Sequence, residues 1–312
     1  MSFSDRYKLL ICIALSLAAE SIARAEFRLG LPGAGELPAY LLELPESVSE
    51  VLIADTGSAT LYRFVVTDQA VLGVDQRYMS IGLNGVGKQR AWDRKTPLGV
   101  YFITERLDTS RMNSKYGVAA FPLDYPNAWD RQNDRTGDGI WLHGVDRADP
   151  ERPPLDTDGC LALANQELLQ LADTIQPLKT PLIVARQIDW ASPAELASLR
   201  RELRAVLDRW RHSLEQGDQQ SFRSLYHGNF NFRGVEDPDG LASRLDDFAA
   251  GELYSVKLRD VLLLADPEEP GLYLSRFTEV ATGSGGTVTT TRRLYWKRAA
   301  NKFLRIVSED SG

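Results

Sequence analysis

The sequence predicts an α+β protein of two units, in which a β-rich unit precedes a unit with helices followed by a curved antiparallel sheet. Short runs rich in β-branched and aromatic residues, separated by Gly, Pro, Asp and Asn, fill the first half of the chain. A strong helix start at Ser192 opens a long amphipathic stretch in the second half, and four alternating segments follow it. A chain of 312 residues is long enough for two such units.

Composition and charge narrow the classes of function. The chain is 43% hydrophobic and 25% charged, as in an ordinary globular protein. Its 43 acidic and 36 basic side chains give a net charge of −7. A negative protein repels the phosphate backbone, so we expect no nucleic-acid partner.

The N-terminus has the pattern of an export signal. Arg6 and Lys8 precede the apolar run "LLICIALSLAA", and the small residues of "ARA" at 23–25 fit a cleavage site. We therefore expect residues 1–25 to be a signal peptide, with an uncleaved membrane anchor as the alternative. Residues 26–47, rich in Gly and Pro, are expected to form an irregular lead-in.

The β-rich unit is expected to span residues 48–187. A hairpin is predicted where "VLIAD" and "TLYRFVV" flank Thr56-Gly57-Ser58. Further short strands are predicted in "YMSIG", "GVYFIT" and "GIWLHGV". After Cys160, Asn165 is expected to cap the N-terminus of a helix, and "TPLIVAR" at 180–186 is expected to close the unit as a strand.

The second unit is expected to span residues 188–312. Ser192, Pro193 and Glu195 form a capping box with Pro at the first helical position, which predicts a helix to about Leu214. A shorter helix is predicted near 219–226. Strands are then predicted in four segments: "LYSVKLRDVLLL", "LYLSRFTEV", "TVTTTRRLYWKR" and "FLRIVSE".

One cysteine is the main chemical signal of the sequence. Cys12 lies in the expected signal peptide, so an exported protein would keep only Cys160, with no partner for a disulfide. His143 ends the apolar strand "GIWLHGV", and a neighbouring imidazole could take the proton of a thiol nucleophile. The residues alone also allow a small buried cysteine and a structural histidine. His212 and His227 are weaker candidates for a base.

"GIWLHGV" followed by "TDGCLAL" resembles the signature of the L,D-transpeptidase catalytic domain, the YkuD-type family. The family pattern is His-Gly, an intervening segment, and then Ser/Thr-x-Gly-Cys. "VLIADTGSATLYRF" resembles the opening hairpin of that domain, and "SIGLNGVGKQRAWDRKTPLGVYFI" resembles its Thr-Pro-x-Gly segment. "YPNAWDRQNDRTGDGIWLHG" resembles the run into the histidine strand. Together these motifs cover roughly residues 48–187.

The resemblance implies roles for individual residues. Cys160 would be the nucleophile and His143 the general base, oriented by a backbone carbonyl. Backbone amides at Gly159 and Cys160 would hold the oxyanion. Asp158, where many members have a histidine, is expected to be a turn residue. The positions that flank the site are Gly144, Thr157, Asp158 and Gly159.

One departure from the family pattern bears on the reaction. Many members have an arginine two residues after the cysteine, where this chain has Ala162. The pattern instead resembles a branch that contains L,D-carboxypeptidases of Gram-negative envelopes, which implies a periplasmic location. "DRWRHSLEQGDQQSFRSLYHGNF" and "RRLYWKRAANKFLRIVSE" resemble the NTF2-like domain joined to such enzymes, notably the helical-cell-shape carboxypeptidases.

The implied partner is the peptidoglycan stem peptide, cleaved between meso-diaminopimelate and D-Ala through a thioester. Water would make the enzyme a carboxypeptidase, whereas an amine acceptor would make 3→3 cross-links or links from protein to peptidoglycan. Other envelope proteins or a second copy of the chain are further candidate partners of the second unit.

A rival hypothesis is an envelope binding protein without catalysis, although a binder needs no unpaired thiol beside a histidine. No cofactor or metal is expected, because no cluster of ligands has the required spacing. Substrate contacts are expected from Asn84, Lys88, Arg94, Tyr125 and Asn127.

Overall fold

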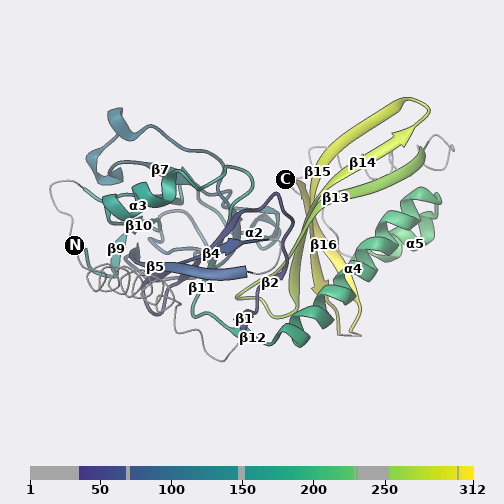
Figure 1. Ribbon diagram of the computed structural model, residues 1–312, viewed down its shortest axis with the longest axis horizontal. Coiled ribbons are helices and arrows are strands. Elements are labelled where there is room, and N and C mark those ends of the chain that lie inside the picture. The colour runs from purple at the N-terminus through teal and green to yellow at the C-terminus, as the bar shows by residue number, and fades with distance from the viewer. Residues whose placement is uncertain (1–34, 68–70, 147–151, 228–229, 231–252, 301) are drawn as a thin grey trace, which may run out of the picture.

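The computed structural model describes residues 35–67, 71–146, 152–227, 230, 253–300 and 302–312 of the chain. The expected signal peptide lies outside these ranges, as does the expected lead-in up to residue 34. Two units lie side by side, with the N-terminal unit in purple to teal and the C-terminal unit in green to yellow (Figure 1). Among the described residues, no helix is both long and apolar enough to cross a membrane.

The N-terminal unit is built on one sheet, which has nine strands in the described part of the chain. Its inner strand β3 (Glu50–Asp55) is buried at every position, which suits an aliphatic run covered on both faces. The expected hairpin is confirmed, because Asp55 of β3 pairs with Thr60 of the antiparallel β4. The order across the sheet is β6 (Gly99–Phe102), β11 (Pro181–Ala185), β3, β4 (Thr60–Val66), β5 (Val71–Gly82), β10 (Leu161–Leu163), β8 (Trp141–His143) and β7 (Ala120–Pro122), and β9 (Leu155–Thr157) pairs with β5 off this path.

Short helices connect these strands and cover the sheet. The longest of them in this unit, α3, follows β10 directly and buries Leu168 and Leu171. Figure 1 shows it lying over β10. The helices of this unit are η1 (Thr109–Arg111), η2 (Ser114–Tyr116), α2 (Ala128–Gln132) and α3 (Asn165–Ala172).

Residues 35–47 differ from the irregular lead-in that we expected. β1 (Leu37–Pro38) pairs with β12 (Trp190–Ala191), and β2 (Leu41–Glu43) adds an edge strand to the sheet of the C-terminal unit. The two leucines of β2 point to opposite sides, because Leu42 joins the core of the C-terminal unit and Leu41 joins a cluster between the units. Burial of both faces therefore holds this Gly- and Pro-rich stretch as strand.

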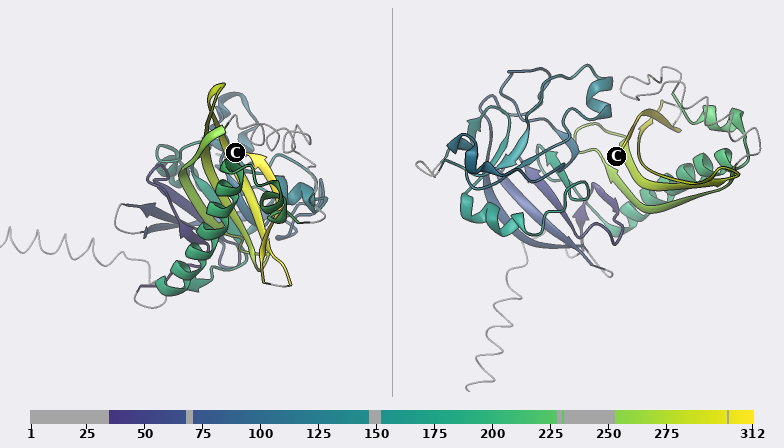
Figure 2. Two further views of the ribbon diagram at one scale, coloured as in Figure 1. Left: turned by 90° about the vertical axis from the view of Figure 1, so that its right-hand side faces the viewer. Right: turned by 90° about the horizontal axis from the view of Figure 1, so that it is seen from above.

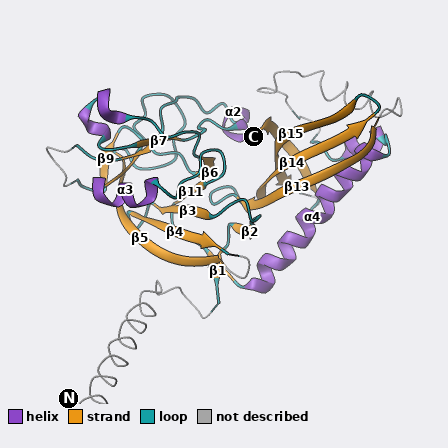
Figure 3. Ribbon diagram, turned by 45° about the horizontal axis from the view of Figure 1, so that its top comes forward, coloured by secondary structure: helices purple, strands orange, loops and turns teal. Residues whose placement is uncertain are grey.

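The C-terminal unit has the predicted order of helices and then strands. The capping box is confirmed: Ser192 Oγ accepts from the Glu195 N–H at 3.3 Å, and the Glu195 carboxylate accepts from the Ser192 N–H at 2.9 Å. The sheet curls, and α4 runs along it (Figures 2 and 3). The elements are α4 (Pro193–Glu215), α5 (Gln219–Ser224), and a sheet in the order β16 (Leu304–Ser311), β15 (Gly286–Arg298), β14 (Leu272–Gly283), β13 (Leu253–Ala265) and β2.

Aromatic side chains fill the space between α4 and the curled sheet. Trp210 of α4 packs edge-on against Phe277 of β14, with ring centroids 5.5 Å apart, and it also contacts Phe222 of α5. Both indole N–H groups of this core have partners: Trp210 donates to the Tyr226 hydroxyl, and Trp296 donates to Ser275 Oγ. These rings serve as core, and each buried donor is satisfied.

A third apolar cluster joins the two units. Val100 and Phe102 of β6 and Ile183 of β11 pack there with Leu262 and Leu264 of β13. Neighbouring residues of β6 and β11 turn their side chains the other way, into the core of the N-terminal unit. The sheet of the N-terminal unit therefore has one face against its own core and one face against the C-terminal unit.

A buried arginine crosses the same boundary. Arg293 of β15 forms ion pairs with Asp124 of the N-terminal unit and with Asp310 of β16, the latter at 2.6 Å. Its guanidinium also lies 5.5 Å from the centroid of the Phe102 ring. Burial alone would lower the pKa of Arg293, but the surrounding Tyr295, Asp124 and Asp310 raise it, so the charge persists.

We expect Arg293→Met to lower the free energy of unfolding by about 3–5 kcal/mol, because it leaves two carboxylates without their buried cation. Denaturant unfolding of both proteins measures the difference. Arg186→Met is the matched control, since Arg186 pairs with Glu268 across the same boundary but is 58% exposed. It should cost less than about 1 kcal/mol. Equal losses in the two variants would contradict a central role for the buried pair.

Candidate active site

His143 stands at the end of β8, in the interior of the sheet. β8 lies between β7 and β10, and His143 pairs with Ala120 on one side and with Ala162 on the other. The side chain is only 3% exposed. The edge of its ring meets Tyr116 of η2, with the centroids 5.3 Å apart. Sheet pairing and this aromatic wall together fix the position of the imidazole.

A single hydrogen bond sets the tautomer of the imidazole. His143 Nδ1 lies 2.5 Å from the carbonyl oxygen of Gly144. A carbonyl can only accept, so Nδ1 carries the proton and Nε2 keeps its lone pair. Burial lowers the pKa of His143 to about 4, although the Gly144 carbonyl opposes this shift. The ring is therefore neutral at neutral pH, and Nε2 is available as a base.

Asn165 holds the turn that follows His143, which differs from the capping role that we expected. Ala164 occupies the cap position, and Asn165 is the first residue of α3. Its Oδ1 accepts from the N–H groups of Val118 and Val145, and its Nδ2 donates to the Val145 carbonyl at 3.0 Å. A Cβ on Gly144 would lie 2.2 Å from this Oδ1, so glycine is required there.

Cys160 reaches the same face of the sheet as His143. β10 runs parallel to β8, and Ala162 pairs with His143. Because side chains alternate along an extended chain, Cys160 shares a face with Ala162 and therefore with His143. The pairing of β8 with β10 thus brings together the two residues that the sequence singled out.

The resting thiol is neutral. Cys160 Sγ donates to the carbonyl of Gly139 at 3.3 Å. Burial raises the pKa of Cys160, while the backbone N–H of Trp141 and the charge of Lys115 act in the opposite direction. The neutral thiol and the neutral imidazole share one face of the sheet, so the sulfur becomes a nucleophile only as its proton passes to the ring.

Two threonines pin the loop before Cys160. Thr157 Oγ1 donates to the Cys160 carbonyl at 2.7 Å and accepts from the Gly159 N–H at 3.1 Å. Thr96 Oγ1 donates to the Gly159 carbonyl at 3.0 Å. The N–H of Gly159 is therefore engaged inside the loop, in contrast to the oxyanion contact that we expected from it. Glycine is required at 159 because φ is +126° and a Cβ would lie 2.7 Å from the Lys95 carbonyl.

The segment 83–96 is organised around Asp93. Its carboxylate accepts from Lys88 Nζ at 2.8 Å and from the N–H groups of Gln89, Arg90 and Lys95. Burial would raise the pKa of Asp93, but Lys88 and these N–H groups outweigh it and hold the pKa at about 2. The Asn84 amide donates to the Asp93 carbonyl. Asn84 and Lys88, two expected substrate contacts, thus form hydrogen bonds within this loop and stabilise it.

Three charged side chains lie beside the nucleophile loop. Asp158, two residues before Cys160, accepts from Arg94 Nε at 3.0 Å. Lys115 Nζ lies 4.0 Å from the other oxygen of the same carboxylate. Arg94 and Lys115 are about half exposed, and Asp158 is about two-thirds exposed. Asp158 therefore does more than complete a turn, because it joins the loop at Arg94 to the helix η2.

Comparison with known proteins agrees with this geometry. Residues 49–184 match the family model described as the L,D-transpeptidase catalytic domain, YkuD. The N-terminal unit is a YkuD-family L,D-transpeptidase catalytic domain. A comparison with curated protein sequences found no match.

Two solved structures share the fold over most of the chain. Bd1075 of Bdellovibrio bacteriovorus is 23% identical, with a TM-score of 0.73, and the match covers 89% of this chain and 98% of that one. The helical cell shape determining protein Pgp2 from Campylobacter jejuni is 21% identical, with a TM-score of 0.73 and coverage of 89% and 96%. These matches extend past the L,D-transpeptidase domain into the curled sheet of the C-terminal unit, whose NTF2-like character stays a prediction.

The remaining predicted contacts lie in the interior of the L,D-transpeptidase domain. The Tyr125 hydroxyl donates to the Thr136 carbonyl at 3.2 Å. Asn127 caps α2 in a capping box with Asp130, and its amide donates to the Val100 carbonyl. Both residues are about 5% exposed or less. These partners favour structural roles, and a direct contact with substrate stays a prediction.

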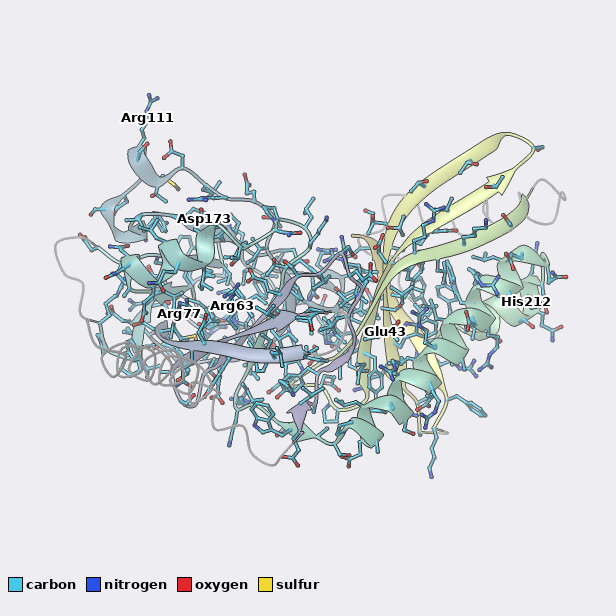
Figure 4. All side chains as sticks on the ribbon, in the orientation of Figure 1. Glu43, Arg63, Arg77, Arg111, Asp173 and His212 are labelled. Carbon is cyan, nitrogen blue, oxygen red and sulfur yellow. The ribbon has the colours of Figure 1, made fainter. Side chains whose placement is uncertain are left out.

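The other two histidines lie in the C-terminal unit. Figure 4 labels His212 near the end of α4, far from Asp173, which lies at the end of α3 in the L,D-transpeptidase domain. The backbone N–H of His227 donates to Ile306 of β16. His143 is therefore the histidine at the thiol. Among the described residues, no three His, Cys, Asp or Glu side chains are grouped so that they could hold a metal ion.

Several residues of the site escaped the sequence analysis. Thr96 lies in the Thr-Pro-x-Gly motif, so the motif gave a signal, but its bond to the nucleophile loop depends on the fold. Lys115 and Tyr116 lie in the short helix η2, which no sequence pattern announced, and Gly139 lies in the run before the histidine strand without a signal that its carbonyl accepts from the thiol. Asn165 has an ordinary helix-start signal, which concealed its role as a clamp between two loops.

We expect Thr157→Val to lower kcat/KM about 10²-fold, because the variant keeps the side-chain shape but frees the loop that positions Cys160. Turnover of muropeptides measures this loss. Thr174→Val is the control, since its hydroxyl donates to the Leu171 carbonyl at the end of α3, away from the nucleophile loop. Both variants should unfold about 1–3 kcal/mol more easily than the native protein. A fall in activity of the same size in the control would refute the positioning role.

The buried imidazole predicts that the pH profile of kcat/KM falls at an unusually low pH on its acid side. A base with a lowered pKa stays neutral to lower pH, so kcat/KM should hold from neutral pH to about pH 5 and fall as the pH drops through about 4. An ordinary histidine would give a limb near 6.5. Tyr116→Ala should admit water to the ring and move the limb toward 6.5. The pH profile of kcat/KM for both proteins tests this, and a native limb near 6.5 would contradict burial as the controlling factor.

Proposed function

We propose that the protein is an exported L,D-carboxypeptidase that trims peptidoglycan stem peptides. The observation that carries this proposal is the pairing of β8 with β10, which puts the neutral Cys160 thiol on one face with the unprotonated Nε2 of His143. The YkuD-family domain supports acyl transfer through that cysteine. The bond that we assign as scissile joins meso-diaminopimelate to the terminal D-Ala of a stem tetrapeptide.

The first half-reaction forms a thioester. Cys160 Sγ attacks the diaminopimelate carbonyl carbon while the thiol proton passes to His143 Nε2. We assign the oxyanion to the backbone N–H of Cys160, because the Gly159 N–H donates to Thr157. The imidazolium then protonates the D-Ala nitrogen, and the C–N bond breaks. The low pKa of His143 makes its imidazolium a strong acid, which suits protonation of an amine leaving group.

The second half-reaction releases the shortened stem. Water gives a proton to His143 Nε2 as its oxygen attacks the thioester carbonyl. The tetrahedral intermediate collapses, the C–S bond breaks, and Cys160 takes the proton back. The products are a tripeptide stem and free D-Ala, and the enzyme returns to its neutral resting pair.

Water as the acceptor is favoured by the residue two positions after the nucleophile, in β10. Ala162 is 2% exposed and stands where many family members have an arginine. An amine acceptor would give 3→3 cross-links or links from protein to peptidoglycan through the same thioester, and the products decide between the two outcomes.

A role in cell shape and a periplasmic location complete the proposal. The structural relative Pgp2 is described as a helical cell shape determining protein, and we extend that role to this chain. The signal-peptide pattern of residues 1–25 supports export, since peptidoglycan lies outside the cytoplasm. The C-terminal unit, which we take to be NTF2-like, offers a surface for other envelope proteins or for a second copy of the chain.

We expect the mature protein to convert purified disaccharide tetrapeptides to disaccharide tripeptides, and Cys160→Ala to be inactive because it lacks the nucleophile. Chromatography with mass spectrometry identifies the products. Tripeptides indicate hydrolysis, and 3→3 dimers indicate transpeptidation. A native protein that leaves muropeptides unchanged, yet binds them, would instead support the non-catalytic binding protein. Equal turnover by native protein and Cys160→Ala would exclude the cysteine mechanism.

A further inference from the structure

The charged group beside the nucleophile loop comes from three separate segments. Arg94 lies in the loop organised by Asp93, Lys115 lies in η2, and Asp158 directly precedes Gly159 and Cys160. The Arg94–Asp158 distance is 3.0 Å, and the Lys115–Asp158 distance is 4.0 Å. Two cations share one anion, so the cluster carries one net positive charge next to the thiol.

The backbone that presents Arg94 is held in an uncommon conformation. Trp92 and Arg94 both have positive φ, +63° and +55°, and Asp93 stands between them. The hydrogen bonds that converge on Asp93 keep this conformation in place. The Arg94 carbonyl accepts from the Asn84 N–H at 3.0 Å. Non-glycine residues persist at positive φ where the surroundings enforce it, and such strain gathers at functional sites. Arg94 is therefore positioned before any ligand arrives.

Lys115 is also close to the reacting groups. Its Nζ lies 5.0 Å from the centroid of the Tyr116 ring, and that ring meets both His143 and Trp141. Burial raises the pKa of Cys160, and the charge of Lys115 opposes that rise. Burial lowers the pKa of His143, and the charge of Lys115 adds to that fall. Arg94 and Lys115 are 47% and 50% exposed, so a ligand can reach both cations.

We propose that Arg94 and Lys115 bind the free carboxylate of the terminal residue of the stem peptide and thereby restrict the enzyme to free ends. This inference rests on the proposed function, since it concerns the substrate of the same site. In a terminal peptide bond, the carboxylate lies only a few bonds from the carbonyl under attack. A guanidinium and an ammonium are the groups that bind a carboxylate through charge-assisted hydrogen bonds. An internal bond has a neutral amide at this position and gains nothing from the two cations.

Asp158 keeps the two cations together when no substrate is bound. Two like charges repel, and a shared carboxylate lowers that cost. Because Asp158 is 66% exposed, it can move aside or share the cations with the incoming carboxylate.

The test compares two synthetic stem tetrapeptides, one with a free C-terminal carboxylate and one with a C-terminal carboxamide. Native protein should prefer the free acid about 10-fold or more in kcat/KM. Arg94→Gln and Lys115→Gln should each raise KM for the acid several-fold with little change for the amide, and the double variant should show almost no preference. Arg106→Gln is the control, because Arg106 also pairs with an exposed acid, Asp173, but at the end of α3. It should retain the native preference.

Binding measured on the Cys160→Ala background separates this inference from the proposed function. Calorimetry there should give an affinity for the acid about 10-fold higher than for the amide, and the added Arg94→Gln and Lys115→Gln changes should abolish the difference. Discrimination in binding without turnover by native protein would support the carboxylate site and reject the carboxypeptidase. Turnover of acid and amide at equal rates, or equal losses on both substrates in the variants, would overturn the carboxylate site and leave the carboxypeptidase standing.

Discussion

The parallel pairing of β8 with β10 is the constraint on which the site depends. It places Ala162 opposite His143 and so brings Cys160 to the face of the imidazole. Other contacts hold the ends of these strands, where sheet hydrogen bonds stop. Asn165 fixes the turn after His143, and Thr157 fixes the turn before Cys160. Each turn contains a glycine, Gly144 or Gly159, at which the Cβ of any other residue would collide with a neighbouring atom. The catalytic geometry is therefore a property of strand register, locked at its two ends.

The electrostatic state of the pair follows from the same burial. Removing water disfavours both the thiolate and the imidazolium, so the pKa of Cys160 rises and the pKa of His143 falls. A resting thiolate–imidazolium pair would need strong polar support, and here the thiol instead donates to the Gly139 carbonyl. Proton transfer must then accompany attack on the substrate. Such a neutral pair reacts slowly with molecules that do not fit the site, because the thiol loses its proton only when a carbonyl is placed beside the sulfur.

Local patterns in the sequence predicted much of the fold, and distant contacts account for most of what they missed. The hairpin of β3 and β4 and the capping box at Ser192 depend on neighbouring residues, and both are confirmed. His143 and Cys160 were found because family motifs encode them. The clamp by Asn165 joins segments about 20 and 47 residues away, so no local pattern announces it. A lysine is usually exposed at the surface, yet Lys88 is buried because it forms an ion pair with Asp93.

The C-terminal unit supports the site through the apolar cluster in which the sheets of the two units pack against each other. β6 follows directly on the loop that carries Arg94 and Thr96, and its Val100 and Phe102 are packed against β13. Asp266, which follows β13, lies close to Gly99, the first residue of β6. Arg293 ties the segment at Asp124 to the C-terminal sheet. The loop beside the nucleophile is thus anchored from behind by the second unit. A displacement of that unit would have to move β6, and with it the threonine that holds the Gly159 carbonyl. The contribution of the C-terminal unit to the site is therefore structural support for β6 and for the loop that precedes it.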